Sequence, residues 1–306
     1  MNEIEQVRII PSEKSLGAEV VGVDLSLPLS DELRDQLVSW WTTHLVLLFR
    51  NQHLTQESQI AATRLFGEVQ VSAAKAYKRA EQEANSAPVM PLEVTAQYEE
   101  ISVVHNLDQD GNPVIQNENL GSGVVPWHSD NSYISAPPSG SMLYAKVVPP
   151  VGGETCFADQ YRAYETLPEE IRLRIDSKTA VHDSSRDGTG TVRHGLAMPT
   201  TLADVPGPHH PLVRTHPVSG RKCLYLGRRR AYPSQYVDGL SEEESTALLA
   251  FLWEHATQEE LVWCHRWREG DVLLWDNRCT MHSREPFPVE YRRIMYRTMI
   301  QGEVPV

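Results

Sequence analysis

The sequence predicts a mainly β fold with helices at its periphery, arranged as a double-stranded β-helix, or jelly-roll barrel. Two observations support this prediction. Strand-like apolar runs outnumber the segments with the 3.6-residue periodicity of an amphipathic helix. No linker divides the 306 residues convincingly, so we expect one domain over residues 1–306.

The pattern of the N-terminal part predicts two helices with a strand between them in the sequence. Residues 30–45 have one apolar helical face, and Ser30 is a suitable N-cap. Residues 45–49 are an apolar run, which predicts a buried strand, and residues 55–66 predict a second helix. The inward residues of the first helix are Leu33, Leu37, Val38 and Trp41. Those of the second helix are Ile60, Ala61 and Leu65.

Residues 70–125 are weakly patterned. They include a polar helix-like stretch at 77–84, a loop with prolines at 87–92, and the turn sequence Asp-Gly-Asn-Pro at 110–113. A long segment of this kind next to candidate site residues is typical of a lid or a binding loop. We therefore expect an insert at about residues 70–125 that closes over the site.

The apolar pattern in the second half of the chain predicts most of the strands of the barrel. Its strand-like segments are residues 141–148, 261–267, 272–275 and 293–300. Its helices are residues 167–175 and 242–256, and the second opens with a capping box from Ser241 to Glu244. Residues 183–208 are rich in Gly, Pro and Asp, which indicates a loop.

Composition and charge exclude several classes of protein. The net charge of −13 argues against nucleic acid or an anionic membrane as partner. No apolar run approaches the roughly 20 residues that span a bilayer, and the N-terminus has acids where a signal peptide needs basic residues. We therefore expect a cytoplasmic protein with reduced core thiols. The four cysteines are Cys156, Cys223, Cys264 and Cys279.

Three separated residues have the composition of a metal site. His128 and Asp130 are one residue apart, so on an extended segment their side chains share a face. His282, on a later strand, can supply a third ligand. Two imidazoles and one carboxylate form the facial triad that binds Fe(II) and leaves positions open for substrate and O2. The alternative is a hydrogen-bonded core histidine with a solvated aspartate.

Arg293, eleven residues after His282, adds a fixed cation near this candidate site. A guanidinium binds a carboxylate bidentately, which suits an anionic co-substrate. Open coordination positions together with such a co-substrate favour iron over zinc.

Nine short blocks in a defined order extend over nearly the whole chain. They are LGAEV at 16–20, GVDL at 22–25, LVLLFR at 45–50, FGE at 66–68, WHSD at 127–130, GGET at 152–155, VRTHP at 213–217, WDNR at 275–278 and RRIMYR at 292–297. Together they resemble the taurine dioxygenase family of Fe(II)- and 2-oxoglutarate-dependent oxygenases. The resemblance implies a jelly-roll fold and the use of Fe(II), 2-oxoglutarate and O2.

The resemblance also implies residue roles. Thr155 and Arg293 match the residues that hold the distal carboxylate of 2-oxoglutarate. Arg297 lies four residues beyond Arg293 on the same predicted strand face and matches the arginine that binds the substrate anion. Tyr133 takes an aromatic position that borders the substrate in relatives, with an ordinary core tyrosine as the alternative.

Two positions at the expected substrate pocket depart from taurine dioxygenase itself. That enzyme has a histidine where this chain has Ser72, and an asparagine where it has Val124. Loss of two polar contacts to a buried sulfonate costs several kcal/mol, at roughly 1–3 kcal/mol each. Taurine is therefore not the expected substrate. Residues 212–222 and 254–258 resemble the 2,4-dichlorophenoxyacetate oxygenase branch more closely, which implies a larger, partly apolar carboxylate.

These features predict a dioxygenase that hydroxylates, and through hydroxylation can cleave, a small carboxylate-bearing substrate such as an aryloxyalkanoate. Two alternatives stay open: desaturation or multi-step oxidation of an N-substituted amino acid, and a metal-binding barrel without turnover. We expect a small anionic partner molecule, and a homo-oligomer is compatible with the sequence. Residues 228–230, three consecutive arginines, are either a solvated turn or a second anion contact at the pocket mouth.

Overall fold

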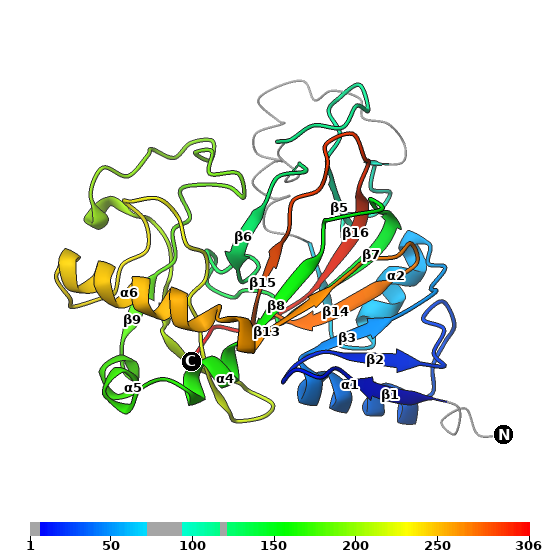
Figure 1. Cartoon of the computed structure of the whole chain (residues 1–306), viewed down its shortest axis with the longest axis horizontal. Helices are drawn as coiled ribbons and strands as arrows, with labels where there is room; N and C mark the ends of the chain where they lie inside the picture. The colour runs from blue at the N-terminus through cyan, green and yellow to red at the C-terminus, as the bar shows by residue number, and fades with distance from the viewer. Residues whose placement is uncertain (1–6, 72–93, 117–120) are drawn as a thin grey trace.

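The computed structural model describes residues 7–71, 94–116 and 121–306 (Figure 1). Its larger sheet contains β1 (Arg8–Pro11), β2 (Ala18–Val21), β3 (Val46–Phe49), β4 (Val69–Gln70), β5 (Ser102–His105), β7 (Gly140–Val147), β14 (Val272–Asp276) and β16 (Ile294–Ile300). Its smaller sheet contains β6 (Val125–His128), β8 (Thr155–Asp159), β13 (Val262–His265) and β15 (Thr280–Arg284). Two strand pairs complete the β structure: β9 (Thr179–Val181) with β10 (His209–Pro211), and β11 (Val213–Thr215) with β12 (Lys222–Leu224).

The two main sheets form the jelly-roll core that the sequence predicts. The larger sheet has the order β1-β2-β3-β14-β7-β16-β4, with β5 also paired to β16, and the smaller has the order β13-β8-β15-β6. Pairing in both is antiparallel except between β2 and β3. Side chains from the two sheets meet in one apolar cluster that includes Phe157, Leu143 and Met295. This packing fixes β8 relative to the larger sheet, and β15 and β6 follow because β15 pairs with β8 and β6 pairs with β15.

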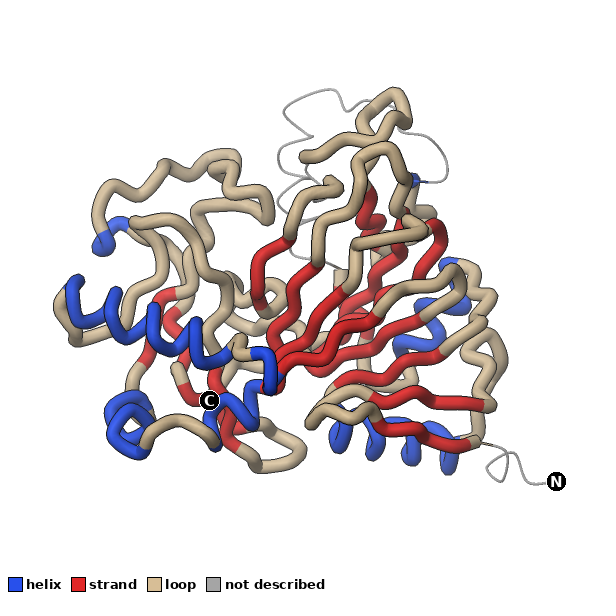
Figure 2. The backbone as a smooth tube through the Cα atoms, viewed as in Figure 1, coloured by secondary structure: helices blue, strands red, loops and turns tan. Residues whose placement is uncertain are grey.

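The helices lie outside the sheets (Figure 2). They are α1 (Asp31–His44), α2 (Gln56–Arg64), α4 (Gln160–Glu165), α5 (Glu169–Ile175) and α6 (Glu242–Ala256), with short 3-10 turns η3 (Leu202–Asp204) and η4 (Glu259–Leu261). Helix α1 packs Leu37 and Trp41 against Phe49 of the larger sheet. Helix α6 packs Leu252 into a second cluster with Met281 of β15.

The predicted helices and strands are confirmed within the described ranges, including the Ser30 cap of α1 and the Ser241 capping box of α6. One inward residue was wrong, because α2 buries Ala62 rather than Ala61. The turn at 110–113 is present, and the amide of Asp108 donates to the carbonyl of Asn112 at 2.8 Å. The expected helix-like stretch at 77–84 and loop at 87–92 lie outside the described residues.

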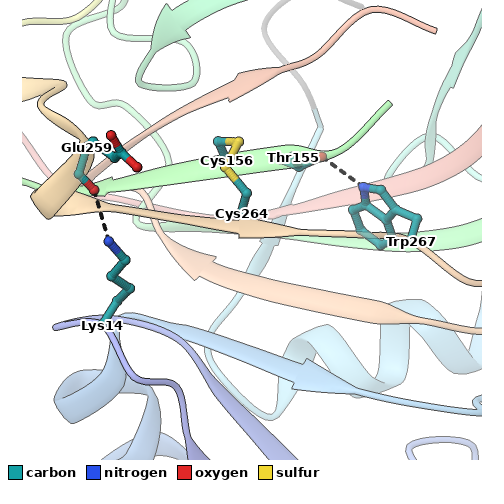
Figure 3. Close-up of a disulfide and its surroundings, with 6 residues drawn as sticks. All are labelled: Lys14, Thr155, Cys156, Glu259, Cys264 and Trp267. Atoms are coloured by element: carbon teal, nitrogen blue, oxygen red, sulfur yellow. Dashed lines mark hydrogen bonds between the residues drawn. A yellow bond between two sulfur atoms is a disulfide. The ribbon is translucent and has the colours of Figure 1, made fainter. Parts of the chain in front are cut away.

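The prediction of four reduced thiols was wrong for two cysteines. Cys156 on β8 and Cys264 on β13 are direct partners in the antiparallel register and form a disulfide (Figure 3). Their separation of 108 residues hides the pairing in the sequence, because only the fold makes these strands neighbours. Cys223 and Cys279 are free and buried, as expected.

Reduction of this disulfide is expected to lower the free energy of unfolding by about 2–4 kcal/mol, because it releases a constraint on a long loop of the unfolded chain. Thermal unfolding with and without a thiol reductant measures the effect. The double variant Cys156→Ser/Cys264→Ser is the control, since the reductant should not change its melting temperature. A melting temperature of the wild type that is the same in both conditions would contradict the prediction.

Candidate active site

Strands β6 and β15 bring the two candidate histidines together. They pair antiparallel, and His128 lies opposite His282 in the register. Asp130, however, lies in the turn after β6 and not on the strand, so strand alternation does not explain its position. Asn277 holds this turn: its Oδ1 accepts from the Asp130 amide at 2.7 Å, and its Nδ2 donates to the Asp130 carbonyl at 3.0 Å.

The three side chains converge on one point. The ligand atoms of His128, Asp130 and His282 lie within 4.8 Å of one another. Asp130 Oδ1 is 3.8 Å from His128 Nε2 and 3.9 Å from His282 Nε2. His128 Nδ1 lies 2.8 Å from the Pro126 carbonyl, so a proton on Nδ1 leaves Nε2 free to bind a metal.

The electrostatic environment keeps these groups in the protonation states that a cation needs. Burial holds the pKa of His128 well below its usual value and lowers the pKa of His282 to about 4, so both imidazoles are neutral at pH 7. Burial opposes ionisation of Asp130, but the charge of Arg297, together with His282 and the hydrogen bond from Ser141, outweighs burial, and the pKa of Asp130 is lowered. Two neutral imidazoles and one carboxylate fit a divalent ion.

A second group of potential ligands is already satisfied by protein contacts. His216, Asp276 and Cys279 lie close together. Arg278 donates to both carboxylate oxygens of Asp276, at 2.9 and 2.6 Å, and His216 Nε2 lies 3.0 Å from Asp276 Oδ2. Burial raises the pKa of the Cys279 thiol well above its usual value, so the thiol stays protonated. This group supports the fold.

Arg293 is a buried cation without an anionic partner in the described part of the chain. It lies just before β16, is 2% exposed, and its Nε has no hydrogen-bond partner. Within the described ranges no carboxylate pairs with it. Burial lowers its pKa well below the usual value, and the charge of Arg284 acts in the same direction. A buried, uncompensated charge is costly, so this position is suited to an anionic ligand.

Trp267 contacts both Thr155 and Arg293, so these two residues lie near each other. The Trp267 indole donates to Thr155 Oγ1 at 2.9 Å, which leaves the threonine hydroxyl proton free to donate in turn (Figure 3). The guanidinium of Arg293 lies over the ring of Trp267, 5.9 Å from its centre. A hydroxyl donor and a guanidinium around one indole are a suitable cradle for a carboxylate.

Of the four residues predicted to contact the substrate, the structure describes three. Arg297 faces inward, and its Nη1 is 3.1 Å from Asp130 Oδ1. Tyr133 is half-buried, with the guanidinium of Arg193 over its ring at 4.3 Å. Val124 is 61% exposed and lines a cavity beside β6. Ser72 lies outside the described residues.

Several site residues were not predicted from the sequence. Ser141 on β7 donates to Asp130 Oδ2 at 2.9 Å. Arg284 lies two residues after His282 on β15 and donates to the Gly121 carbonyl at 2.8 Å. The amide of Arg293 donates to Asn106 Oδ1 at 2.8 Å. Of these residues, only Arg284 could have been predicted from the sequence, because residues two apart on a strand share a face and Arg284 lies two residues after His282.

A jelly roll with a buried His-Asp-His group and a neighbouring unpaired arginine defines the class of non-haem metal oxygenases that use an anionic co-substrate. Sequence comparison agrees with this class. The profile described as taurine catabolism dioxygenase TauD, TfdA family matches residues 8–299, and the chain belongs to this family. It is a 2-oxoglutarate-dependent dioxygenase that requires Fe(II), 2-oxoglutarate and O2.

Named relatives align over most of the chain. The (S)-phenoxypropionate/alpha-ketoglutarate-dioxygenase of Sphingobium herbicidovorans is 33% identical over 305 residues, covering 96% of this chain and 95% of the relative. The alpha-ketoglutarate-dependent 2,4-dichlorophenoxyacetate dioxygenase of Cupriavidus pinatubonensis is 36% identical and covers 82% and 83%. The crystal structure of AAD-2 in complex with Mn(II) and N-oxalylglycine is similar with a TM-score of 0.77 and 30% identity, covering 98% of both chains. In the ranges that the structure describes, no helix is long and apolar enough to cross a membrane.

Proposed function

We propose that this enzyme hydroxylates the ether-bearing carbon of an aryloxyalkanoate or a closely related small carboxylate. The observation that carries the proposal is the inward position of Arg297, whose guanidinium contacts the candidate metal ligand Asp130. A cation beside the reacting centre, separate from the cation for 2-oxoglutarate, implies a substrate with its own anionic group. The relatives named for phenoxypropionate and 2,4-dichlorophenoxyacetate support this substrate class.

In this proposal His128, Asp130 and His282 hold Fe(II), and Arg293 with Thr155 holds the distal carboxylate of 2-oxoglutarate. When bound, iron and 2-oxoglutarate together activate O2, so that a C–H bond becomes C–OH while 2-oxoglutarate becomes succinate and CO2. The protein supplies orientation. Each arginine fixes one anion, and the buried surroundings exclude water.

The position of the new hydroxyl decides the product. When the hydroxylated carbon also carries an aryl ether oxygen, the product is a hemiacetal or a hemiketal. The hydroxyl proton passes to the ether oxygen, the C–O bond to that oxygen breaks, and a phenol leaves with a 2-oxo acid as the other product. Ether cleavage therefore needs only that Arg297 place this carbon near the metal centre.

Replacement of Arg297 by Ala is expected to raise the KM for the substrate at least tenfold, because a charge-assisted contact is worth about 1.5–3 kcal/mol. The affinity for 2-oxoglutarate should stay near normal, since Arg293 holds that anion. Steady-state kinetics, scored by succinate release, measures both quantities.

The methyl ester of the best acid is the matched chemical control, because it removes the substrate's charge and keeps the carbon skeleton. Wild-type enzyme should turn over the acid and reject the ester. Equal rates on acid and ester would show that Arg297 does not recognise the substrate anion.

Oxidation of an N-substituted amino acid is the second candidate. Such a substrate also has a carboxylate for Arg297, so the position of this arginine does not distinguish the two substrate classes. A substrate panel that contains aryloxyalkanoates, sulfonates and N-substituted amino acids distinguishes them, and we expect the aryloxyalkanoates to have the highest kcat/KM.

A further inference from the structure

A cavity of about 530 Å³ lies between the start of β6 and residues 228–231. This volume is within the roughly 300–1,000 Å³ of small-molecule sites. Apolar side chains on one part of its lining include Ile115, Val124 and Pro126. The rest is dominated by the guanidinium-bearing residues Arg186, Arg228, Arg229 and Arg230.

Among the residues that the structure describes, Arg228 and Arg230 have no acidic partner. Arg228 Nη1 donates to the carbonyl of Gly188 at 2.9 Å, and Arg230 Nη2 donates to the carbonyl of Arg186 at 3.1 Å. Arg186 differs, because Asp183 pairs with it at 3.0 Å. In the 7–71, 94–116 and 121–306 ranges, no carboxylate oxygen lies within 4.0 Å of Arg228 or Arg230. The carbonyl contacts orient both guanidinium groups and leave some of their N–H donors available.

The charge at this cavity is opposite to that of the chain. The chain has a net charge of −13, yet the described lining residues include no Asp or Glu. Burial lowers the pKa of Arg228, and it lowers the pKa of Arg230 to about 10, with the charge of Arg228 acting in the same direction. Both side chains are only partly buried, so an anion can reach guanidinium groups that have no carboxylate partner among the described residues.

Arg228 lines the cavity and is also the backbone neighbour of a candidate metal ligand. The backbone of Arg228 forms an antiparallel bridge with His128, and the Ser129 amide donates to the Gly227 carbonyl at 2.8 Å. Positive charge therefore extends from Arg297 at the metal centre, through Arg228, to Arg230 in the cavity.

We propose that this cavity is a second anion-binding subsite, in which Arg228 and Arg230 hold an anionic group at the far end of the substrate. The inference rests on the proposed function, since it assigns another part of the same substrate. The preferred substrate is then a dianion: one carboxylate next to the reacting carbon pairs with Arg297, and a carboxylate, sulfonate or phosphate on the aryl end occupies the cavity.

Binding of two probes tests this inference. Phenoxyacetate carries one carboxylate, and 4-carboxyphenoxyacetate carries a second one on the ring. Calorimetric titration of the enzyme with Fe(II) and 2-oxoglutarate, without oxygen, should give at least about tenfold tighter binding of the dianion. The variants Arg228→Gln and Arg230→Gln should lose this advantage and keep their affinity for phenoxyacetate within about threefold.

Two further variants make the result specific. Arg228→Lys keeps the charge and should retain most of the preference, whereas Arg174→Gln on α5, away from the cavity, should not change it. If Arg228→Gln does not fold, Arg230→Gln and Arg228→Lys decide the question. If phenoxyacetate binds and the second carboxylate adds nothing, or if Arg230→Gln retains the full advantage, only this inference is overturned. If neither probe binds the wild type, the proposed function fails with it.

Discussion

Replacement of any one of His128, Asp130 or His282 by Ala is expected to lower Fe(II)-dependent turnover more than about 100-fold. Loss of an outer-shell partner of a metal site already costs about 10–100-fold, and each of these substitutions removes one of the three proposed ligands. The fold should persist, because none of the three residues belongs to the apolar clusters that form the core of the described part of the chain.

His209→Ala is a matched control for the histidine variants. His209 is exposed and pairs with Asp238, away from the candidate metal centre. Turnover and metal content, measured on the same samples with circular dichroism as the check of folding, separate loss of iron from loss of structure. Retention of more than a few per cent of activity by any ligand variant, at saturating Fe(II), would show that the triad is assigned incorrectly.

Replacement of Arg293 is expected to give the second largest effect. Truncation of a buried partner in a charge pair costs about 2–5 kcal/mol, so Arg293→Ala should weaken 2-oxoglutarate binding from about 30-fold to several thousandfold. Iron affinity should change little. Anaerobic titration of the metal-to-ligand charge-transfer band with 2-oxoglutarate measures the loss.

Arg293→Met separates function from stability. Met keeps most of the volume and removes a buried charge that has no carboxylate partner in the described ranges. This variant should lose 2-oxoglutarate binding and have a melting temperature equal to or above that of the wild type. Arg266→Ala, an exposed arginine, is the control. Unchanged 2-oxoglutarate affinity in both Arg293 variants would refute the assigned role.

The sequence was most informative where structure depends on local pattern. Apolar periodicity and capping residues locate α1, α2 and α6, because these signals act over one or two helical turns. The chemistry of the candidate site was also accessible, since the residue types of a facial triad and a carboxylate-binding arginine are restrictive.

Features that depend on long-range contacts were less accessible. Cys156 and Cys264 become partners only when β8 and β13 pair, and Ser141 on β7 reaches Asp130 only when the fold brings the two together. Strand alternation was the wrong reason for the position of Asp130, which depends on two hydrogen bonds between its backbone and the side chain of Asn277. The sequence could not distinguish the arginines at the cavity from a solvated turn, because the partial burial of Arg228 and Arg230 is a property of the fold.

Product stoichiometry is the most direct measurement of the central claim, namely oxidation of a carboxylate-bearing aryl ether coupled to 2-oxoglutarate. The enzyme is incubated with Fe(II), 2-oxoglutarate, O2 and an aryloxyalkanoate, and succinate and the released phenol are quantified together. One succinate per phenol is expected, with both products absent when Fe(II) is chelated. Succinate that forms at the same rate without the aryloxyalkanoate, and no phenol, would contradict the claim.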